Sequence, residues 1–324
     1  MLKSKIKLVR RERKKVSAFS LSASGETSPK GGQPSAFACS AFTLVEILVV
    51  VVLMALIVLA LMAVFSSTQA AFRASLTQTD VLEGGRATMG MFKSDLESMT
   101  PSFGVSNGAV NFCVNTNRFQ YGSNSPPLVQ SLSGSSPTTQ RTNVLENFFI
   151  LTRQNTAWTG VGYVVDTTST NYFNPLYRFT ITTNVMAKNV PAILYTTFSN
   201  ASFANMSHLM DGVMHLTVRA FDPNGYWMTN TIEMDGGRFV TNRNVKFLLP
   251  ALGEVGFYMF SNTLPASVEI QLGLLEDRTL QRAQSLPNGA PVWAQSNYLA
   301  GRAGQVHLFR QRFPIRNVDP SAYQ

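Results

Sequence analysis

The chain has 324 residues and a formal net charge of +9, which at first suggests a nucleic-acid partner. Nine of its 27 Lys and Arg residues but only two of its 18 Asp and Glu residues lie within residues 1–41, so the remainder carries a net charge of only +2. The excess charge therefore belongs to the amino-terminal flank, and we expect no nucleic-acid binding by the rest of the chain.

Residues 1–41 form a basic leader. Residues 16–40 are rich in Ser, Gly, Pro and Ala and lack a helical or strand period, which predicts disorder. Because positively charged flanks stay in the cytoplasm, the leader predicts that the chain after the membrane helix lies outside it. A lipoprotein signal is excluded, since its apolar segment would precede Cys39 rather than follow it.

Residues 42–65 contain the most apolar stretch of the chain. The 19 residues from Ile47 to Phe65 carry no charge, amide or hydroxyl group, and as a helix they span about 28 Å, the thickness of a bilayer core. A secretory signal has a shorter apolar region that ends at a small-x-small site, and no such site follows here. Glu46 at the start is the exception, because a carboxylate in a bilayer needs a partner or a function.

This stretch resembles the processing site of type IV prepilins and type II secretion pseudopilins: a small residue, then Phe42-Thr43-Leu44-x-Glu46 and an apolar helix. The family usually has Gly where this chain has Ala41, and a shorter leader. The resemblance implies that a membrane peptidase cuts between Ala41 and Phe42 and that the new amino group of Phe42 is methylated. Glu46 would then face the amino group of a neighbouring subunit, a pairing that lowers the cost of both charges in low dielectric.

Residues 66–100 are predicted to continue the helix in amphipathic form. Gly84 and Gly85 are poor helix formers and predict a soft point or kink, and Pro101 predicts the end. The apolar positions recur mostly three, four or seven residues apart, at Phe65, Phe72, Leu76, Leu82, Met89, Phe92, Leu96 and Met99.

Side chains of this second half predict packing rather than chemistry. Met at helical spacing is typical of core filling, although a soft metal site is the alternative for Met89, Met91 and Met99. Three charged residues are expected in solvated or helix-to-sheet ion pairs, namely Arg86, Asp95 and Glu97.

Residues 101–324 predict a strand-rich head. The segment 123–141 reads as an exposed loop and a candidate contact surface, and 222–225 as a hairpin turn. Cys113 is expected to be a buried small hydrophobe, because it is the one cysteine beyond the leader and has no internal disulfide partner. Short helices or turns are expected at 207–212 and 278–285. β-branched and aromatic runs predict strands at 110–114, 118–121, 147–152, 160–165, 177–182, 215–222, 226–233, 256–261, 266–274 and 305–312.

Parts of the head resemble the minor pseudopilin J family. The similar segments are 161–165, 176–178, 209–219 and 264–272, in the same order as in that family. Together with the helix, Arg86 and the 93–96 stretch, they extend the resemblance to much of residues 42–274. The segment 310–317 is similar to prepilin-like proteins of the Verru_Chthon cassette type.

No pattern in the sequence predicts catalysis. Metal-ligand spacing, a phosphate loop, a dinucleotide fingerprint and a nucleophile elbow are all missing, so no cofactor or metal is expected. His208 and Asp211 could form an acid/base pair, but a surface contact is the simpler reading. Asp222 and Asn224 could offer oxygens to calcium, but a turn explains them equally.

Basic residues near the carboxyl end leave two readings open. They could attract an acidic partner, or they could keep an edge strand soluble, and the second reading is the simpler one. The residues are Arg302, Arg310, Arg312 and Arg316.

We therefore expect an α+β, pilin-like protein in which a long amino-terminal helix packs on an antiparallel, strand-rich head. The resemblance implies a minor pseudopilin, not an enzyme, in the inner membrane with a periplasmic head. Its partners would be other pseudopilins or pilins, the prepilin peptidase/methyltransferase, the inner-membrane assembly platform and membrane lipid. One alternative is a minor pilin of a type IV pilus whose head binds a surface, a partner or DNA. Another is a membrane-tethered hydrolase with a pocket around His208 and Asp211.

Overall fold

The computed structural model describes residues 42–104, 108–116, 127–132, 139–168, 171–184, 190–229, 244–248, 252–286 and 293–323. The leader with Ala41 and the strand expected at 118–121 lie outside these ranges. The chain divides into two compact units, Met1–Met62 and Ala63–Gln324, and each is described by itself.

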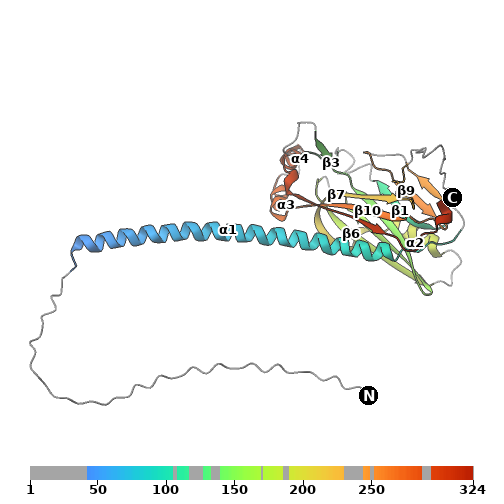
Figure 1. Cartoon of the computed structure of the whole chain (residues 1–324), viewed down its shortest axis with the longest axis horizontal. Coiled ribbons are helices and arrows are strands. Elements are labelled where there is room, and N and C mark those ends of the chain that lie inside the picture. Colours follow the sequence, from blue (N-terminus) through green and yellow to red (C-terminus); the bar gives the residue numbers. More distant parts are fainter. Residues whose placement is uncertain are drawn as a thin grey trace, which may run out of the picture. The chain divides into compact units, whose positions relative to one another are not determined.

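One long helix, α1 (Leu44–Glu97), begins the described chain (Figure 1). The predicted continuation beyond the apolar run is confirmed, and the helix ends three residues before the expected position. It ends because the chain turns to pair with the sheet: Met99 bridges Thr152, and the Thr100 N–H donates to the Leu151 carbonyl at 3.0 Å.

Gly84 and Gly85, where the sequence predicts a soft point or kink, lie within α1, and the helix is continuous across them. A Cβ on Gly85 would lie 2.3 Å from the Phe309 ring, so glycine lets this aromatic side chain approach the helix backbone. The glycine signal in the sequence therefore marks close packing.

In the described ranges, the head is built on a nine-stranded sheet in which every strand pairing is antiparallel. Its order is β11-β10-β7-β6-β5-β4-β1-β9-β8. The strands are β1 (Val110–Thr116), β4 (Glu146–Gln154), β5 (Ala157–Val165), β6 (Asn174–Asn184), β7 (Ser207–Phe221), β8 (Val245–Phe247), β9 (Phe257–Phe260), β10 (Ser267–Leu275) and β11 (Val306–Pro314).

The last turns of α1 pack into the larger hydrophobic core of the head. Phe92 is fully buried, and its ring meets those of Phe148 and Tyr163 edge-on, with centroids 5.4 and 4.6 Å away. Met89, Leu96 and Met99 belong to the same core. The residues predicted to be core filler on this face, Met89 and Met99, are therefore buried, whereas Met91 is 36% exposed.

A second, smaller core lies between the sheet and α2 (Val190–Ser199). Gly160 and Gly162 of β5 make room for it, because a Cβ on Gly162 would lie 2.1 Å from the Phe198 ring and one on Gly160 would lie 3.2 Å from Leu194. Each face of the sheet thus has its own helix-covered core.

Several predicted elements need correction. The segment 207–212, expected as a short helix or turn, is the start of β7, where Gly212 has φ +75° beside a shift of strand register. The strand expected at 226–233 is reduced, in its described part, to one bridge between Phe221 and Trp227. Within the expected exposed loop 123–141, Leu128 and Gln130 are buried.

The remaining elements are short. β2 (Val129–Ser131) and β3 (Gln140–Thr142) form a separate two-stranded sheet. The expected helix near 278–285 is α3 (Asp277–Gln284), and α4 (Trp293–Ala300), like α2, had no counterpart in the sequence prediction.

Candidate functional site

The amino end of α1 holds the predicted functional carboxylate in a capping box. Glu46 Oε2 accepts hydrogen bonds from the Thr43 backbone N–H at 2.9 Å and from the Thr43 hydroxyl at 3.0 Å, and the Glu46 N–H donates to the Thr43 hydroxyl at 3.3 Å. This exchange satisfies N–H groups that a helix start leaves without partners. A Thr-x-x-Glu spacing at the start of an apolar helix is the sequence signal for this capping box.

The capping box leaves part of the carboxylate unused. Both bonds go to Oε2, and within the described residues no hydrogen bond to Glu46 Oε1 is found. The donors are a neutral hydroxyl and a neutral amide, so the negative charge of Glu46 is not compensated by them. A cation can therefore still pair with this side chain.

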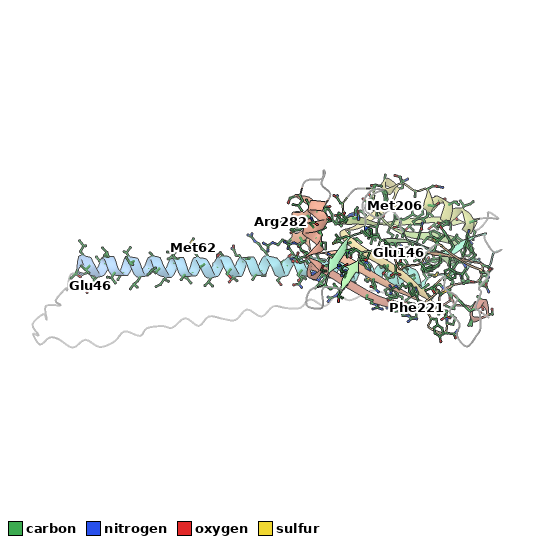
Figure 2. All side chains as sticks on the ribbon, turned by 90° about the horizontal axis from the view of Figure 1, so that it is seen from above. Glu46, Met62, Glu146, Met206, Phe221 and Arg282 are labelled. Atoms are coloured by element: carbon green, nitrogen blue, oxygen red, sulfur yellow. The ribbon has the colours of Figure 1, made fainter. Side chains whose placement is uncertain are left out.

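The helix surface around this carboxylate is apolar and exposed. Every residue from Phe42 to Arg73 is exposed, and Glu46 is the one charged residue before Arg73 in that stretch. Figure 2 shows these side chains on α1 near the labelled Glu46 and Met62. One helix of the described chain is thus long and apolar enough to cross a membrane.

The carboxyl end of α1 is fixed to the head by an ion pair. The Arg178 guanidinium on β6 donates from Nε and Nη2 to the two Asp95 oxygens, each at 3.0 Å, and the Tyr163 hydroxyl also donates to Asp95. Burial, and after it the Asp95 charge, raise the pKa of Tyr163, so its hydroxyl stays a donor. The predicted helix-to-sheet pairing of Asp95 is confirmed.

The segment after β11 also holds this end of the helix. Arg316 pairs with Glu97 at 3.2 Å, and the Asn317 side-chain amide donates to the Met99 carbonyl at 2.8 Å. Residues more than two hundred positions apart thus meet where α1 ends.

The basic residues near the carboxyl end all have partners within the chain. Arg302 stacks on Tyr298 at 4.2 Å, Arg312 on Phe221 at 3.7 Å, and Arg310 pairs with Glu269 at 2.9 Å. β11, which carries two of these arginines, is the terminal strand of the sheet. This placement agrees with the edge-strand reading of these charges.

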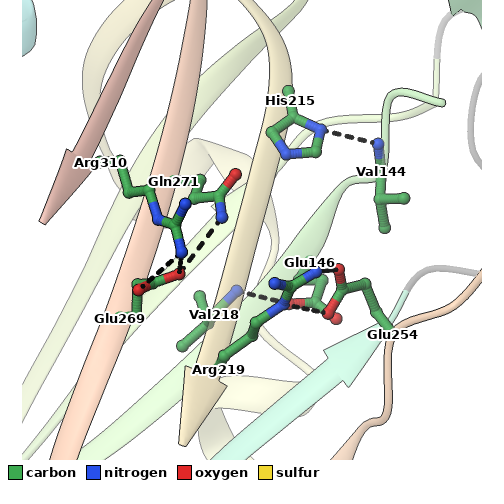
Figure 3. Close-up of polar contacts among 9 residues, drawn as sticks. All are labelled: Val144, Glu146, His215, Val218, Arg219, Glu254, Glu269, Gln271 and Arg310. Carbon is green, nitrogen blue, oxygen red and sulfur yellow. Dashed lines mark hydrogen bonds and ion pairs between the residues drawn. The ribbon is translucent and has the colours of Figure 1, made fainter. Parts of the chain in front are cut away.

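Other ionisable groups cluster on β7 and the strands beside it (Figure 3). Glu146 is fully buried and accepts a hydrogen bond from the Val218 N–H at 2.6 Å. The Arg219 Nε donates to Glu254 at 2.9 Å, which raises the pKa of Arg219. These side chains connect segments distant in sequence, and no sequence pattern pointed to them.

His215 lies in the same cluster and is held in its neutral form. Its Nδ1 accepts the Val144 N–H at 3.1 Å. Burial, and after it the charges of Arg141 and Arg219, lower the pKa of His215 to about 4. At neutral pH the ring therefore serves as a buried acceptor.

The remaining candidates for chemistry occupy exposed or structural positions. His208 and Asp211 lie 3.0 Å apart on β7, with side chains 47% and 62% exposed. The Asp222 carboxylate accepts the Tyr226 N–H at 2.7 Å, so it serves the turn that was predicted there. Cys113 is buried, and burial raises its thiol pKa to about 12.

No group of three or more His, Cys, Asp or Glu side chains suited to a metal ion occurs in the described ranges. Against known proteins, no protein-family model matches the chain and no curated protein is significantly similar to it.

Proposed function

We propose that this chain is a minor pseudopilin, most similar to pseudopilin J, which assembles through α1 into a type II secretion pseudopilus or a related filament. The leader stays in the cytoplasm, α1 crosses the inner membrane, and the head lies in the periplasm. The proposal rests on the prepilin-like sequence around Phe42 and on the properties of one helix.

The observation that carries the proposal is the division of α1 into an exposed apolar part and a buried part. A membrane anchor needs about 20 residues, yet α1 has 54 residues from Leu44 to Glu97. Its first half exposes its apolar side chains, and its last turns are in the core of the head. Such a helix can pack against other helices while it remains fixed to its own head.

Charge pairing would specify how neighbouring helices meet. Cleavage after Ala41 creates an ammonium group on Phe42, and an unpaired ammonium or carboxylate is costly in a bilayer. The Oε1 atom of Glu46, which the capping box leaves open, would accept the ammonium of the adjacent subunit. Helix contact in one register then neutralises both charges.

The test separates the charge of Glu46 from its capping role. Glu46→Gln removes the charge but retains a side chain that can cap the helix, whereas Thr43→Val removes the cap and keeps the charge. We expect Glu46→Gln to insert into the membrane but to be lost from sheared filaments, and Thr43→Val to be incorporated. Incorporation of Glu46→Gln at the wild-type level would refute the charge-pairing mechanism.

Processing is tested by the mass of the amino-terminal peptide of the membrane-extracted protein. The proposal expects a chain that begins at N-methylated Phe42. A chain that is still intact from Met1 in assembled filaments would contradict the proposal.

A further inference from the structure

A groove runs between α1 and β11 on the head. It has a volume of about 410 Å³, is open to solvent, and is lined by the helix on one side and the terminal strand on the other. Three of its lining residues are basic, and two of these belong to the helix. The lining includes Arg86, Gly90 and Lys93 of α1 and Leu308, Phe309 and Arg310 of β11.

The strand that forms one wall has a free edge. β11 pairs with β10, and at its two ends the Ile315 N–H donates to Ala266 and the Gln305 carbonyl accepts from Glu276. The backbone N–H and C=O groups of successive residues point alternately to the two sides of an antiparallel strand. Between residues 305 and 315, the groups of the odd-numbered residues therefore point to β10. The N–H and C=O groups of Leu308, Arg310 and Arg312 therefore point outward, and in the described part of the chain they have no backbone partner.

The helix side of the groove is basic. No ion pair of Arg86 is found in the described ranges, and Lys93 reaches Glu97 only at 3.9 Å and is 54% exposed. Side chains alternate along β11, so Leu308 and Arg310 lie on the opposite face of the strand from Phe309, which meets α1. There Leu308 is 49% exposed, and Arg310, although paired with Glu269, is 63% exposed. A segment that binds here must therefore be extended, with free backbone N–H and C=O groups, and must carry negative charge and some apolar surface.

This chemistry excludes three occupants. The first is a second copy of the chain, because pairing through β11 would bring its arginines against those of the first copy. The second is the leader of the chain, because it is basic and would be repelled by Arg86 and Lys93. Lipid headgroups are out of reach if the apolar run is in the membrane, because Arg86 lies about 32 Å along the helix from Phe65.

We propose that the free edge of β11 and the groove beside it bind an extended, acidic segment of a partner protein by strand addition. The segment extends the sheet through hydrogen bonds to residues 308–312, and its carboxylates meet Arg86 and Lys93. This binding site concerns the head and does not depend on how α1 assembles.

The experiment uses the full chain in detergent micelles and a fluorescein-labelled peptide of alternating Val and Glu, with binding followed by fluorescence anisotropy. Two matched peptides serve as controls, one with Gln for every Glu and one with N-methylated backbone amides. We expect both controls to bind at least tenfold more weakly, and we expect salt to weaken binding of the acidic peptide.

Variants locate the site. A Cβ on Gly90 meets nothing within 4 Å, so Gly90→Trp fills the groove without disturbing the core, and Gly90→Ala is its control. Arg310→Pro removes an outward N–H together with the guanidinium, whereas Arg310→Ala removes the guanidinium alone. We expect Gly90→Trp and the exposed charge reversal Arg86→Glu to weaken binding tenfold or more, Gly90→Ala to bind normally, and Arg310→Pro to bind more weakly than Arg310→Ala.

Three results would overturn the proposal. Equal binding of the acidic and N-methylated peptides would exclude strand addition, and displacement of the peptide by a single-stranded oligonucleotide would indicate a general anion site. Unchanged affinity in both Gly90→Trp and Arg86→Glu would place the peptide elsewhere. Because Arg86→Glu alters a solvent-facing side chain, the test remains decisive if Gly90→Trp fails to fold.

Discussion

The ion pair between Asp95 and Arg178 is expected to contribute strongly to the docking of α1 on the sheet. Asp95→Ala would leave the Arg178 guanidinium and the Tyr163 hydroxyl without their shared acceptor. Loss of one partner of a buried pair costs about 3–5 kcal/mol. The Arg178 and Asp95 side chains are 25% and 16% exposed, so solvent screening reduces the cost. We therefore expect Asp95→Ala to lower the unfolding free energy by about 2–3 kcal/mol.

Urea-induced unfolding of the full chain in detergent measures this loss, because all three tryptophans lie in the head and report on it. Asp211→Ala is the matched control. It removes a polar contact between His208 and Asp211, whose side chains are 47% and 62% exposed, and it should change the unfolding free energy by less than about 0.5 kcal/mol. A double-mutant cycle with Arg178→Met should give a coupling of at least about 1 kcal/mol. Equal effects of Asp95→Ala and Asp211→Ala, or no coupling, would refute the reasoning.

Three further predictions concern packing, pH and thiol access. Gly90→Ala should raise the unfolding free energy by about 0.5–1 kcal/mol through helix propensity. Gly85→Ala should raise it less, or lower it, because the Phe309 ring occupies the space that the new methyl group needs. Equal urea midpoints of the two variants would argue against this packing role of Gly85. The pKa of His215 is lowered to about 4 in the folded chain, so between about pH 6.5 and 4 the unfolded chain binds a proton on this ring that the folded chain does not. The unfolding free energy should therefore fall as the pH falls through that window, by on the order of 3 kcal/mol. An unfolding free energy that does not change with pH in this window would contradict a buried neutral ring. In a Cys39→Ser variant, Cys113 should react with a thiol reagent at pH 8 only after unfolding, and rapid labelling of the folded chain would show that it is accessible.

Elements dominated by local pattern were predictable from the sequence. α1 follows from its apolar period, and β4, β5, β6 and β10 follow from runs of β-branched and aromatic residues. β7 was predicted only in its second half, because Gly212 and the polar residues before it read as a turn while the strand passes through an irregularity there. α2 contains β-branched residues that disfavour a helix, although Pro191 in its first turn is a usable start signal.

The candidate site was predictable only where its partners are close in sequence. The Thr43–Glu46 capping box is a short-range pattern and can be found by spacing alone. The partner of Asp95 could be assigned to the sheet but not to Arg178, because the register of distant strands decides which cation lies opposite the helix. The contacts of Glu146 and Glu254 depend on the same long-range arrangement.

The contact between Gly85 and Phe309 has a consequence for the order of events during synthesis. β11 is made after all the other strands of the sheet, yet its side chain packs on a helix made near the start of the chain. Until the ribosome has passed this strand, the face of α1 at Gly85 lacks the ring that covers it. Contacts this distant in sequence slow folding, so we expect the head to complete its fold only after the nascent chain is already held by its apolar helix.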